Sequence, residues 1–402
     1  MNMMLLCRAL AMTAVVMILS ACSSVSSKPV PLRNIAEQAK LLQGATVLDV
    51  DRFEPVETIG QKCTVRPIAR NDSAVTDRLN AALEQAKSYS DAQKGIGLMV
   101  VWNGSVIHET YEQGTDAQTQ TDSYSMNKSL LGLAYMAALE DGIIPSLDVP
   151  ISRYISEWDG DPRGDLTLRQ VLHMESGLKV YSFQEPGSKA LALMLQSDIN
   201  AVALSYPATE PAGKQFKYNN VNSQLAGLAL SRALQSKAKI SYPRFVEQRI
   251  WCPIGNGKAD FWLDRKDGSI HHFAALFSSL ENWARLGELI RNQGHVGEAA
   301  VIGSSWIAKM AEPAATNAAY GLHIWRGAQW QKQRRYNPEN PLTVLHSEKY
   351  LADDIMFFDG FGGQRVYIIP SAGLTIARTG QVNFQYDDSK IVNILLRALQ
   401  DD

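Results

Sequence analysis

The chain has 402 residues, of which 46% are hydrophobic and 20% are charged. This ordinary balance excludes an intrinsically disordered or fibrous protein, and the length predicts about two to three domains. The 39 basic and 41 acidic residues give a formal net charge of −2. Because no basic block appears either, we expect no nucleic-acid partner. No cysteine or histidine pattern indicates a zinc site, and nothing implies a metal or another cofactor.

The N-terminus predicts a secretory signal. One basic residue precedes an apolar run over 9–19, which is too short to span a bilayer but typical of a signal peptide. The following Leu-Ser-Ala-Cys resembles a bacterial lipobox, which implies a lipoprotein signal peptide over 1–21 and lipidation of Cys22. The alternative is an ordinary signal peptide with an incidental cysteine. Residues 22–35 predict a tether, and Ser23 is typical of outer-membrane sorting. We therefore expect a lipid-anchored, periplasm-facing protein of the cell envelope.

The first elements after the tether have clear patterns. Residues 74–88 predict an amphipathic helix. Residues 95–102 and 105–111 are apolar and β-prone, and the Asn-Gly pair between them favours a hairpin turn because both residues tolerate positive φ. Residues 126–139 are apolar on nearly every face, which predicts a buried central helix.

The middle of the chain, over 150–310, shows mostly helical patterns broken by proline and glycine. A helix is predicted over 280–291, with Ser278 and Glu281 as its capping box. A last helix is predicted over 390–399. Strand-like runs lie before it, over 318–326, 341–358 and 364–378.

This order of elements predicts an α+β fold. Strands near both ends of the mature chain indicate one antiparallel sheet flanked by helices, with a mostly helical insert as a second domain. We assign 36–140 and 311–402 to the sheet domain and 141–310 to the helical domain.

A Ser-x-x-Lys pattern is the first sign of chemistry. It occurs at Ser125, Ser176 and Ser236, but only Ser125 opens a long apolar helix. A helix start favours negative charge on a nearby oxygen, and Lys128 lies one turn further on the same face. A buried lysine loses its charge readily and can act as the base that a serine nucleophile needs. The alternative is a helix-capping serine beside a surface lysine.

Two later segments add to this pattern. In Tyr218-Asn219-Asn220, the phenol of Tyr218 can pass a proton, and the amide of Asn220 can orient a substrate carbonyl or hold the lysine. In Gly360-Phe361-Gly362, the glycines let a substrate approach backbone N–H groups. One of these groups and the N–H of Ser125 would form an oxyanion hole. The alternatives are a turn with a packed tyrosine and a simple glycine bulge.

The mature chain resembles the serine β-lactamase and penicillin-binding-protein superfamily, and within it the class C-like branch with esterases and 6-aminohexanoate-dimer hydrolases. The stretches that carry the resemblance are SYSMNKS (123–129), LTLRQVLHMESGL (166–178), GKQFKYNNVNSQLAG (213–227), FSSLENWARLG (277–287) and GFGGQRVYIIP (360–370). The resemblance implies the β-lactamase/transpeptidase-like fold.

The resemblance also implies roles for single residues. Ser125 matches the acylated nucleophile, Lys128 its base and Tyr218 the proton-shuttling tyrosine, while Asn220 matches the third residue of the tyrosine motif. Gly360, Phe361 and Gly362 stand where the superfamily usually has Lys-Thr-Gly or His-x-Gly, and Phe361 would lend the backbone donor. Tyr181 is expected to line the pocket.

These residues predict a serine hydrolase that cleaves a small amide or ester through an acyl-enzyme on Ser125. One alternative is a D-alanyl carboxypeptidase or β-lactamase acting on cell-wall-type substrates. Another is a catalytically silent binding lipoprotein of the envelope. The expected partners are a small-molecule amide, ester or peptide substrate and a membrane reached through Cys22. In an oxidising compartment Cys63 and Cys252 either pair or stay as two buried thiols, and the sequence leaves both open.

Overall fold

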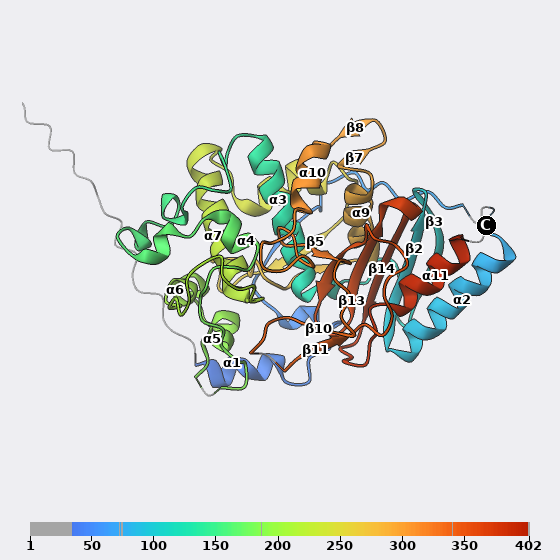
Figure 1. Cartoon of the computed structure of the whole chain (residues 1–402), viewed down its shortest axis with the longest axis horizontal. Coiled ribbons are helices and arrows are strands. Elements are labelled where there is room, and N and C mark those ends of the chain that lie inside the picture. Colours follow the sequence, from blue (N-terminus) through green and yellow to red (C-terminus); the bar gives the residue numbers. More distant parts are fainter. Residues whose placement is uncertain (1–33, 72, 74, 186, 340, 401–402) are drawn as a thin grey trace, which may run out of the picture. The chain divides into compact units, whose positions relative to one another are not determined.

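The computed structural model describes residues 34–71, 73, 75–185, 187–339 and 341–400 (Figure 1). The predicted signal peptide over 1–21 and the lipidation site Cys22 lie outside these residues. Within the described part, no helix has the length and apolar character that crossing a membrane requires. Helix α1, Ile35–Leu42, begins where the tether was predicted to end, with Asn34 as its N-cap.

The main sheet confirms the predicted antiparallel sheet from both chain ends. Its strand order is β3-β2-β14-β13-β12-β9, and every neighbouring pair is antiparallel. Strands β2 and β3 come from the first part of the chain, and the other four come from its end. The bounds are β2 Gly95–Trp102, β3 Ser105–Tyr111, β9 Trp325–Arg326, β12 Met356–Gly360, β13 Gln364–Ile369 and β14 Leu374–Gly380.

The first hairpin forms where the sequence predicts it. Asn103 and Gly104 both have positive φ, at 48° and 80°, as the tight turn between β2 and β3 requires. The backbone N–H of Asn103 donates to the carbonyl of Gly373, in the turn between β13 and β14, at 2.8 Å. The two hairpins are therefore joined at their turns as well as along β2 and β14.

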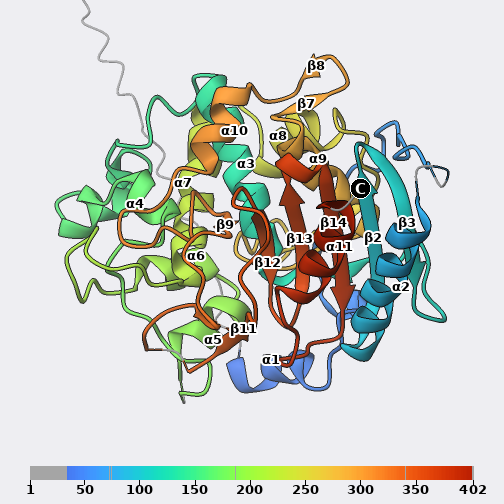
Figure 2. The same cartoon turned by 45° about the vertical axis from the view of Figure 1, so that its right-hand side comes forward.

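Helices cover both faces of the main sheet. On one face, α2 (Asp77–Ala92) and α11 (Lys390–Gln400) lie side by side, over strand residues such as Val100 and Ile376 (Figures 1 and 2). On the opposite face lies α9 (Leu280–Arg291). The alternation of side chains along the strands explains why both faces are apolar.

The cap of α9 differs from the prediction. Its N-cap is Ser279, whose hydroxyl accepts a hydrogen bond from the N–H of Asn282, and not Ser278. Ser278 is the last residue of β6, where its extended backbone pairs with Thr121. The Glu281 carboxylate accepts instead from the N–H of Ile68. Ser278, which the sequence pattern assigned to the N-cap of α9, is therefore part of strand β6.

A second sheet of four strands has the order β1-β5-β6-β4. Its bounds are β1 Val56–Ile59, β4 Thr121–Asp122, β5 Ala259–Trp262 and β6 Leu276–Ser278. The region 141–310 is mostly helical, but through β5, β6 and α9 it also packs on segments of the predicted sheet domain. The predicted domain boundaries stay a prediction.

The central helix α3, Asn127–Glu140, is buried at every position up to Leu139. It packs against α7 and α10 and follows the 3₁₀ turn Tyr124–Met126. The remaining elements are α4 Leu168–Leu172, α5 Lys189–Leu195, α6 Ile199–Leu204, α7 Asn220–Lys237, α8 Tyr242–Val246, the π-helix Glu247–Trp251, β7 His295–Val296, β8 Ala299–Ala300, α10 Ser304–Met310, β10 Gln333–Arg335 and β11 Thr343–Leu345.

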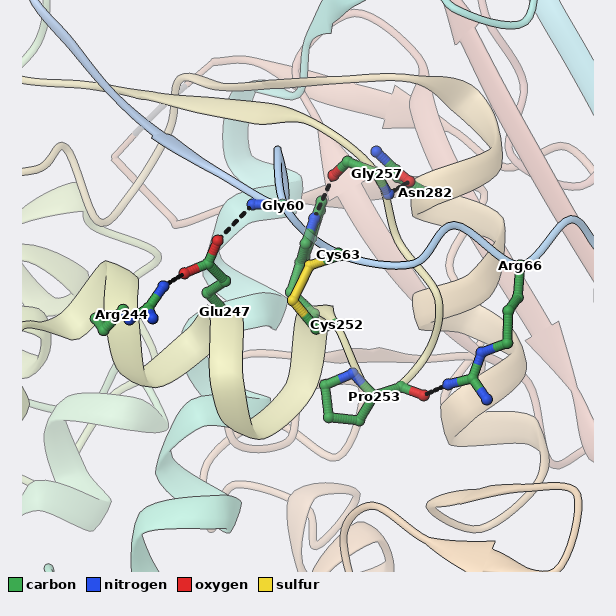
Figure 3. Close-up of a disulfide and its surroundings, with 10 residues drawn as sticks. Gly60, Cys63, Arg66, Arg244, Glu247, Cys252, Pro253, Gly257 and Asn282 are labelled. Atoms are coloured by element: carbon green, nitrogen blue, oxygen red, sulfur yellow. Dashed lines mark hydrogen bonds and ion pairs between the residues drawn. A yellow bond between two sulfur atoms is a disulfide. The ribbon is translucent and has the colours of Figure 1, made fainter.

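Cys63 and Cys252 form a disulfide, which decides between the two alternatives left open by the sequence (Figure 3). It fastens the segment after β1 to the end of the π-helix, across 189 residues of chain. Next to it the Glu247 carboxylate accepts from the N–H of Gly60 at 3.0 Å and pairs with Arg244. The N-terminal segment is thus held to the helical region by one covalent bond and several polar contacts.

Candidate active site

Ser125 and Lys128 lie together at the start of the buried helix. Ser125 is the middle residue of the 3₁₀ turn that leads into α3, and Lys128 lies in the first turn of α3. The Lys128 amine nitrogen (Nζ) is 2.9 Å from the Ser125 hydroxyl oxygen (Oγ). The helix start therefore brings the predicted nucleophile and the predicted base into direct contact.

The surroundings of Lys128 favour its neutral form. Only 1% of the side chain is exposed, and burial holds its pKa well below the usual value, against the opposing negative charge of Asp359. Nζ also lies 2.9 Å from the amide oxygen of Asn220 and 2.8 Å from the carbonyl oxygen of Phe273. A neutral amine can donate to these two oxygens and keep its lone pair for the hydroxyl proton of Ser125.

Tyr218 completes a cluster of three side chains. The neighbouring Ser125 hydroxyl acts to lower the pKa of Tyr218, and the ring centroid of Tyr218 lies 4.9 Å from Nζ of Lys128. Burial raises the pKa of Tyr218 well above its usual value, and the neighbouring Tyr320 and the charge of Asp359 act in the same direction. The phenol therefore stays protonated and can give a proton to a leaving group.

Aromatic packing fixes the position of Tyr218. Its ring is stacked on Trp325 at 5.7 Å between centroids, and it contacts Tyr320 and Tyr336 at 6.0 and 5.2 Å. The backbone N–H of Tyr218 donates to the carbonyl of Tyr336 at 3.1 Å. Of the two roles predicted for Asn220, the structure favours the second, because its amide oxygen accepts from Lys128.

The turn around Ser125 has an unusual backbone. Tyr124 has a φ of 44°, in the left-handed region that a bulky residue seldom adopts. Its N–H donates to a carboxylate oxygen of Asp122 at 2.8 Å, which holds this conformation in place. Burial raises the pKa of Asp122 to about 7. Such backbone strain beside a reactive group is a common feature of functional sites.

The predicted glycine segment lies beside this turn. Gly360 ends β12, and a Cβ atom there would clash with the carbonyl oxygen of Ser123. The Phe361 ring is 37% exposed and lies 5.8 Å from the ring of Tyr124 and 5.2 Å from that of Phe384. Gly362 has a φ of 75° and continues the turn into β13. The segment is thus adjacent to the nucleophile turn, as an oxyanion hole requires.

Tyr181 lies in the segment between α4 and α5. Its ring packs against Tyr206 at 5.2 Å and under the amine of Lys179 at 4.7 Å. The side-chain amide of Asn219 donates to the carbonyl of Lys179 at 3.0 Å. This bond links the Tyr181 segment to the tyrosine motif, although the described contacts of Tyr181 do not include Ser125.

The sequence analysis missed several residues that shape the cluster. Asp359 is buried and is paired with Arg334 at 2.5 Å and with Arg365 at 2.8 Å. Its only sequence signal is its place directly before the glycine segment. Phe273 contacts Lys128 through its backbone carbonyl, which any residue could provide. Trp325 contacts Tyr218 by ring stacking. Neither contact is visible as a sequence motif.

Comparison with known proteins identifies the family of this chain. A family model described as Beta-lactamase matches residues 80–399. The chain belongs to the β-lactamase family. This confirms the predicted resemblance, and the strand order and flanking helices agree with the β-lactamase/transpeptidase-like fold.

Solved structures similar to this β-lactamase-family protein share its fold at low sequence identity. A protein from Bacillus anthracis, assigned as a 6-aminohexanoate-dimer hydrolase, is 19% identical, with a TM-score of 0.66 over 88% of this chain and 92% of its own. A family VIII carboxylesterase is 14% identical, with a TM-score of 0.59 over 83% and 99%. A penicillin-binding-protein homologue from Caulobacter crescentus is 14% identical, with a TM-score of 0.59 over 80% and 98%.

Proposed function

We propose that the protein is a serine hydrolase that cleaves a small amide or ester through an acyl-enzyme on Ser125. The observation that carries the proposal is the contact of the half-buried Ser125 hydroxyl with the fully buried Lys128 amine, next to the phenol of Tyr218. The hydrolase-rich family and the named activities of the similar structures support it.

The chemistry needs two steps. The Lys128 amine takes the hydroxyl proton as Ser125 attacks the substrate carbonyl, and the N–H groups of Ser125 and Phe361 stabilise the oxyanion. Tyr218 then protonates the leaving amine or alcohol, and an ester bond to Ser125 remains. A water molecule attacks that ester by the same route in reverse, which releases the acid and restores the hydroxyl.

The substrate is expected to be neutral and partly apolar near the reacting bond. Gly360 stands where the superfamily usually places a charged or imidazole side chain, and the ring of the next residue, Phe361, forms an exposed aromatic group with Tyr124 and Phe384. An aromatic surface beside the reacting bond favours an apolar acyl or leaving group over the carboxylate of a β-lactam or a D-alanyl peptide. We further propose that a lipid on Cys22 anchors the protein to the cell envelope.

The decisive experiment is intact mass after exposure to a fluorophosphonate. The wild-type protein is expected to gain one adduct, and the Ser125→Ala protein none. The matched control is Ser236→Ala, because Ser236 belongs to another Ser-x-x-Lys pattern, in the exposed last turn of α7. No adduct on folded wild-type protein would overturn the mechanism and favour a binding lipoprotein. An adduct that persists in Ser125→Ala would also overturn it, because the reactive nucleophile would then be another residue.

A substrate panel then separates the enzyme classes. Acetyl and hexanoyl p-nitrophenyl esters, the matching anilides, a cephalosporin and a D-alanyl-D-alanine peptide are compared at one enzyme concentration. Faster turnover of the hexanoyl ester and anilide supports the proposed apolar preference. Preferred turnover of the peptide or the cephalosporin would instead assign the enzyme to cell-wall-type substrates.

A further inference from the structure

A cavity of about 350 Å³ lies next to the reactive cluster but does not include it. Trp325 is the residue shared by the two: it lines the cavity and is also stacked on Tyr218. Neither Ser125 nor Lys128 nor Tyr218 belongs to the wall. The cavity has the size of a small-molecule site, and the proposed reaction does not account for it.

The wall of the cavity is basic. Among the described residues, it includes Arg326, Arg334, Arg335 and His346 and no aspartate or glutamate. Arg334 is already paired with the buried Asp359 and Asp388, at 2.5 and 2.9 Å. For Arg326 and Arg335 the described part of the chain offers no ion pair. The cavity therefore carries uncompensated positive charge, which attracts an anion.

Polar atoms at the wall also lack partners. Within the described part of the chain, Nε and Nη1 of Arg334, Nε2 of His346 and the hydroxyl of Tyr350 are buried without a hydrogen bond. Leaving such a group unpaired is costly, so each native case needs an explanation. These four atoms, on three residues of one cavity wall, are explained together if a ligand with acceptor oxygens provides the missing bonds.

Aromatic side chains form another part of the wall, beside uncharged polar residues such as Gln215 and Gln329. Phe216, Trp325, Trp330 and Phe357 all contribute to it. Trp330 is 44% exposed, so one aromatic wall is open to solvent. Flat apolar surfaces of this kind bury a hydrocarbon chain or a ring. The ligand must therefore combine an anionic end with an apolar body.

We propose that this cavity binds a small monocarboxylate with an aliphatic or aromatic body. The carboxylate would take its hydrogen bonds from Arg334, Tyr350 and the neighbouring basic side chains, and the body would lie against Trp325 and Trp330. Because Trp325 stacks on Tyr218, occupancy of the cavity changes the packing of the proton donor in the reactive cluster. The site does not depend on the proposed function, since a Ser125→Ala protein retains the whole wall.

The test uses intrinsic tryptophan fluorescence and calorimetry on the Ser125→Ala protein, which excludes turnover. Hexanoate and benzoate are the probes, and hexanamide and benzamide are their uncharged controls. Both acids are expected to bind saturably, about tenfold or more tighter than their amides, because a charge-assisted hydrogen bond is stronger than a neutral one. Equal binding of acids and amides, or no saturable binding of either acid, would overturn the proposal.

Two variants locate the site. Tyr350→Phe removes only a hydroxyl that has no described partner, and Arg326→Gln removes a charge at the wall, so both are expected to fold. Each should weaken hexanoate binding about fivefold or more. Arg52→Gln, which removes an arginine outside the wall, should leave the binding constant unchanged. If neither wall variant weakens binding, the acid binds elsewhere and the assignment is wrong.

Experiments on the wild-type enzyme distinguish two sources of the acid, its own reaction product and an unrelated effector. If the ligand is the acid that the enzyme itself releases, the acids of its fastest esters should bind tightest and slow turnover from this cavity, an effect that Tyr350→Phe relieves. If it is an unrelated effector, the ranking of the acids will not follow the ranking of the esters.

Discussion

Gly360 packs against Ser123 so closely that no side chain fits between strand β12 and the nucleophile turn. Because Ser123 lies two residues before Ser125, this contact sets the distance between the reactive hydroxyl and the turn that holds Phe361. The absence of a Cβ atom at one residue thus determines where an oxyanion hole can form.

Gly360→Ala should reduce kcat/KM about a hundredfold or more, because the new methyl group separates Phe361 from Ser125 and removes one oxyanion donor. The measurement is kcat/KM for the best ester of the substrate panel. Gly142→Ala is the control: Gly142, unlike Gly360, has a positive φ of 68°, but a Cβ atom there meets nothing within 4 Å. Unchanged activity in a folded Gly360→Ala protein would contradict the role of this contact.

The activity should depend on pH through Lys128. Burial lowers the pKa of this amine, so its neutral, basic form persists to a lower pH than that of an ordinary lysine and is lost as the pH falls through the lowered pKa. We expect kcat/KM to rise with pH to a plateau. Lys128→Arg, which stays protonated, should lower the plateau by about 10²- to 10⁴-fold. A rising limb that is identical in wild type and Lys128→Arg would assign the titration to another group.

Tyr218→Phe should separate the two halves of the reaction. Without the phenol, an anilide loses its proton donor, whereas p-nitrophenolate leaves without one. We expect the anilide rate to fall about 10²- to 10³-fold and the activated ester rate to fall much less. Tyr320→Phe is the control, since Tyr320 contacts the Tyr218 ring without a described bond to Ser125. Equal losses for both substrates would show that Tyr218 acts in activation of the nucleophile instead.

The disulfide should stabilise the fold without taking part in the reaction. It closes a loop of 189 residues, so its loss in a Cys63→Ala/Cys252→Ala protein should lower the free energy of unfolding by about 2–5 kcal/mol. Urea unfolding of wild type with and without a reductant, beside the double variant, measures this. The reductant should destabilise the wild type only. A loss of fluorophosphonate labelling in the folded double variant would mean that the disulfide also positions Ser125.

Local patterns predicted the elements that depend on neighbours in sequence. The Asn-Gly turn gave β2 and β3 with the observed bounds, and the apolar run gave the buried α3. Where two local signals compete, the prediction shifted by one residue: the extended pairing of Ser278 in β6 left the cap of α9 to Ser279. Helix α1 was missed because residues 35–42 are largely exposed and show no strong period.

For the candidate site, motif spacing was enough to select residues that the fold brings together, namely Ser125, Lys128, Tyr218 and Asn220. It could not select groups that act over long chain separations without a motif. The carbonyl of Phe273, the carboxylate of Asp359 and the ring of Trp325 act through position alone. The basic cavity was missed for the same reason, because its wall combines residues 215–216 with residues scattered between 316 and 357.

The position of β14 also determines when the main sheet can be completed during synthesis. This strand, from Leu374 to Gly380, lies between β2 and β13. A ribosome that has just added Gly360 has made the serine, the lysine and the tyrosine, but not the strand that joins the two halves of the sheet. A stop codon anywhere before β14 therefore yields an unfinished sheet, in which β2 and β13 keep open edges.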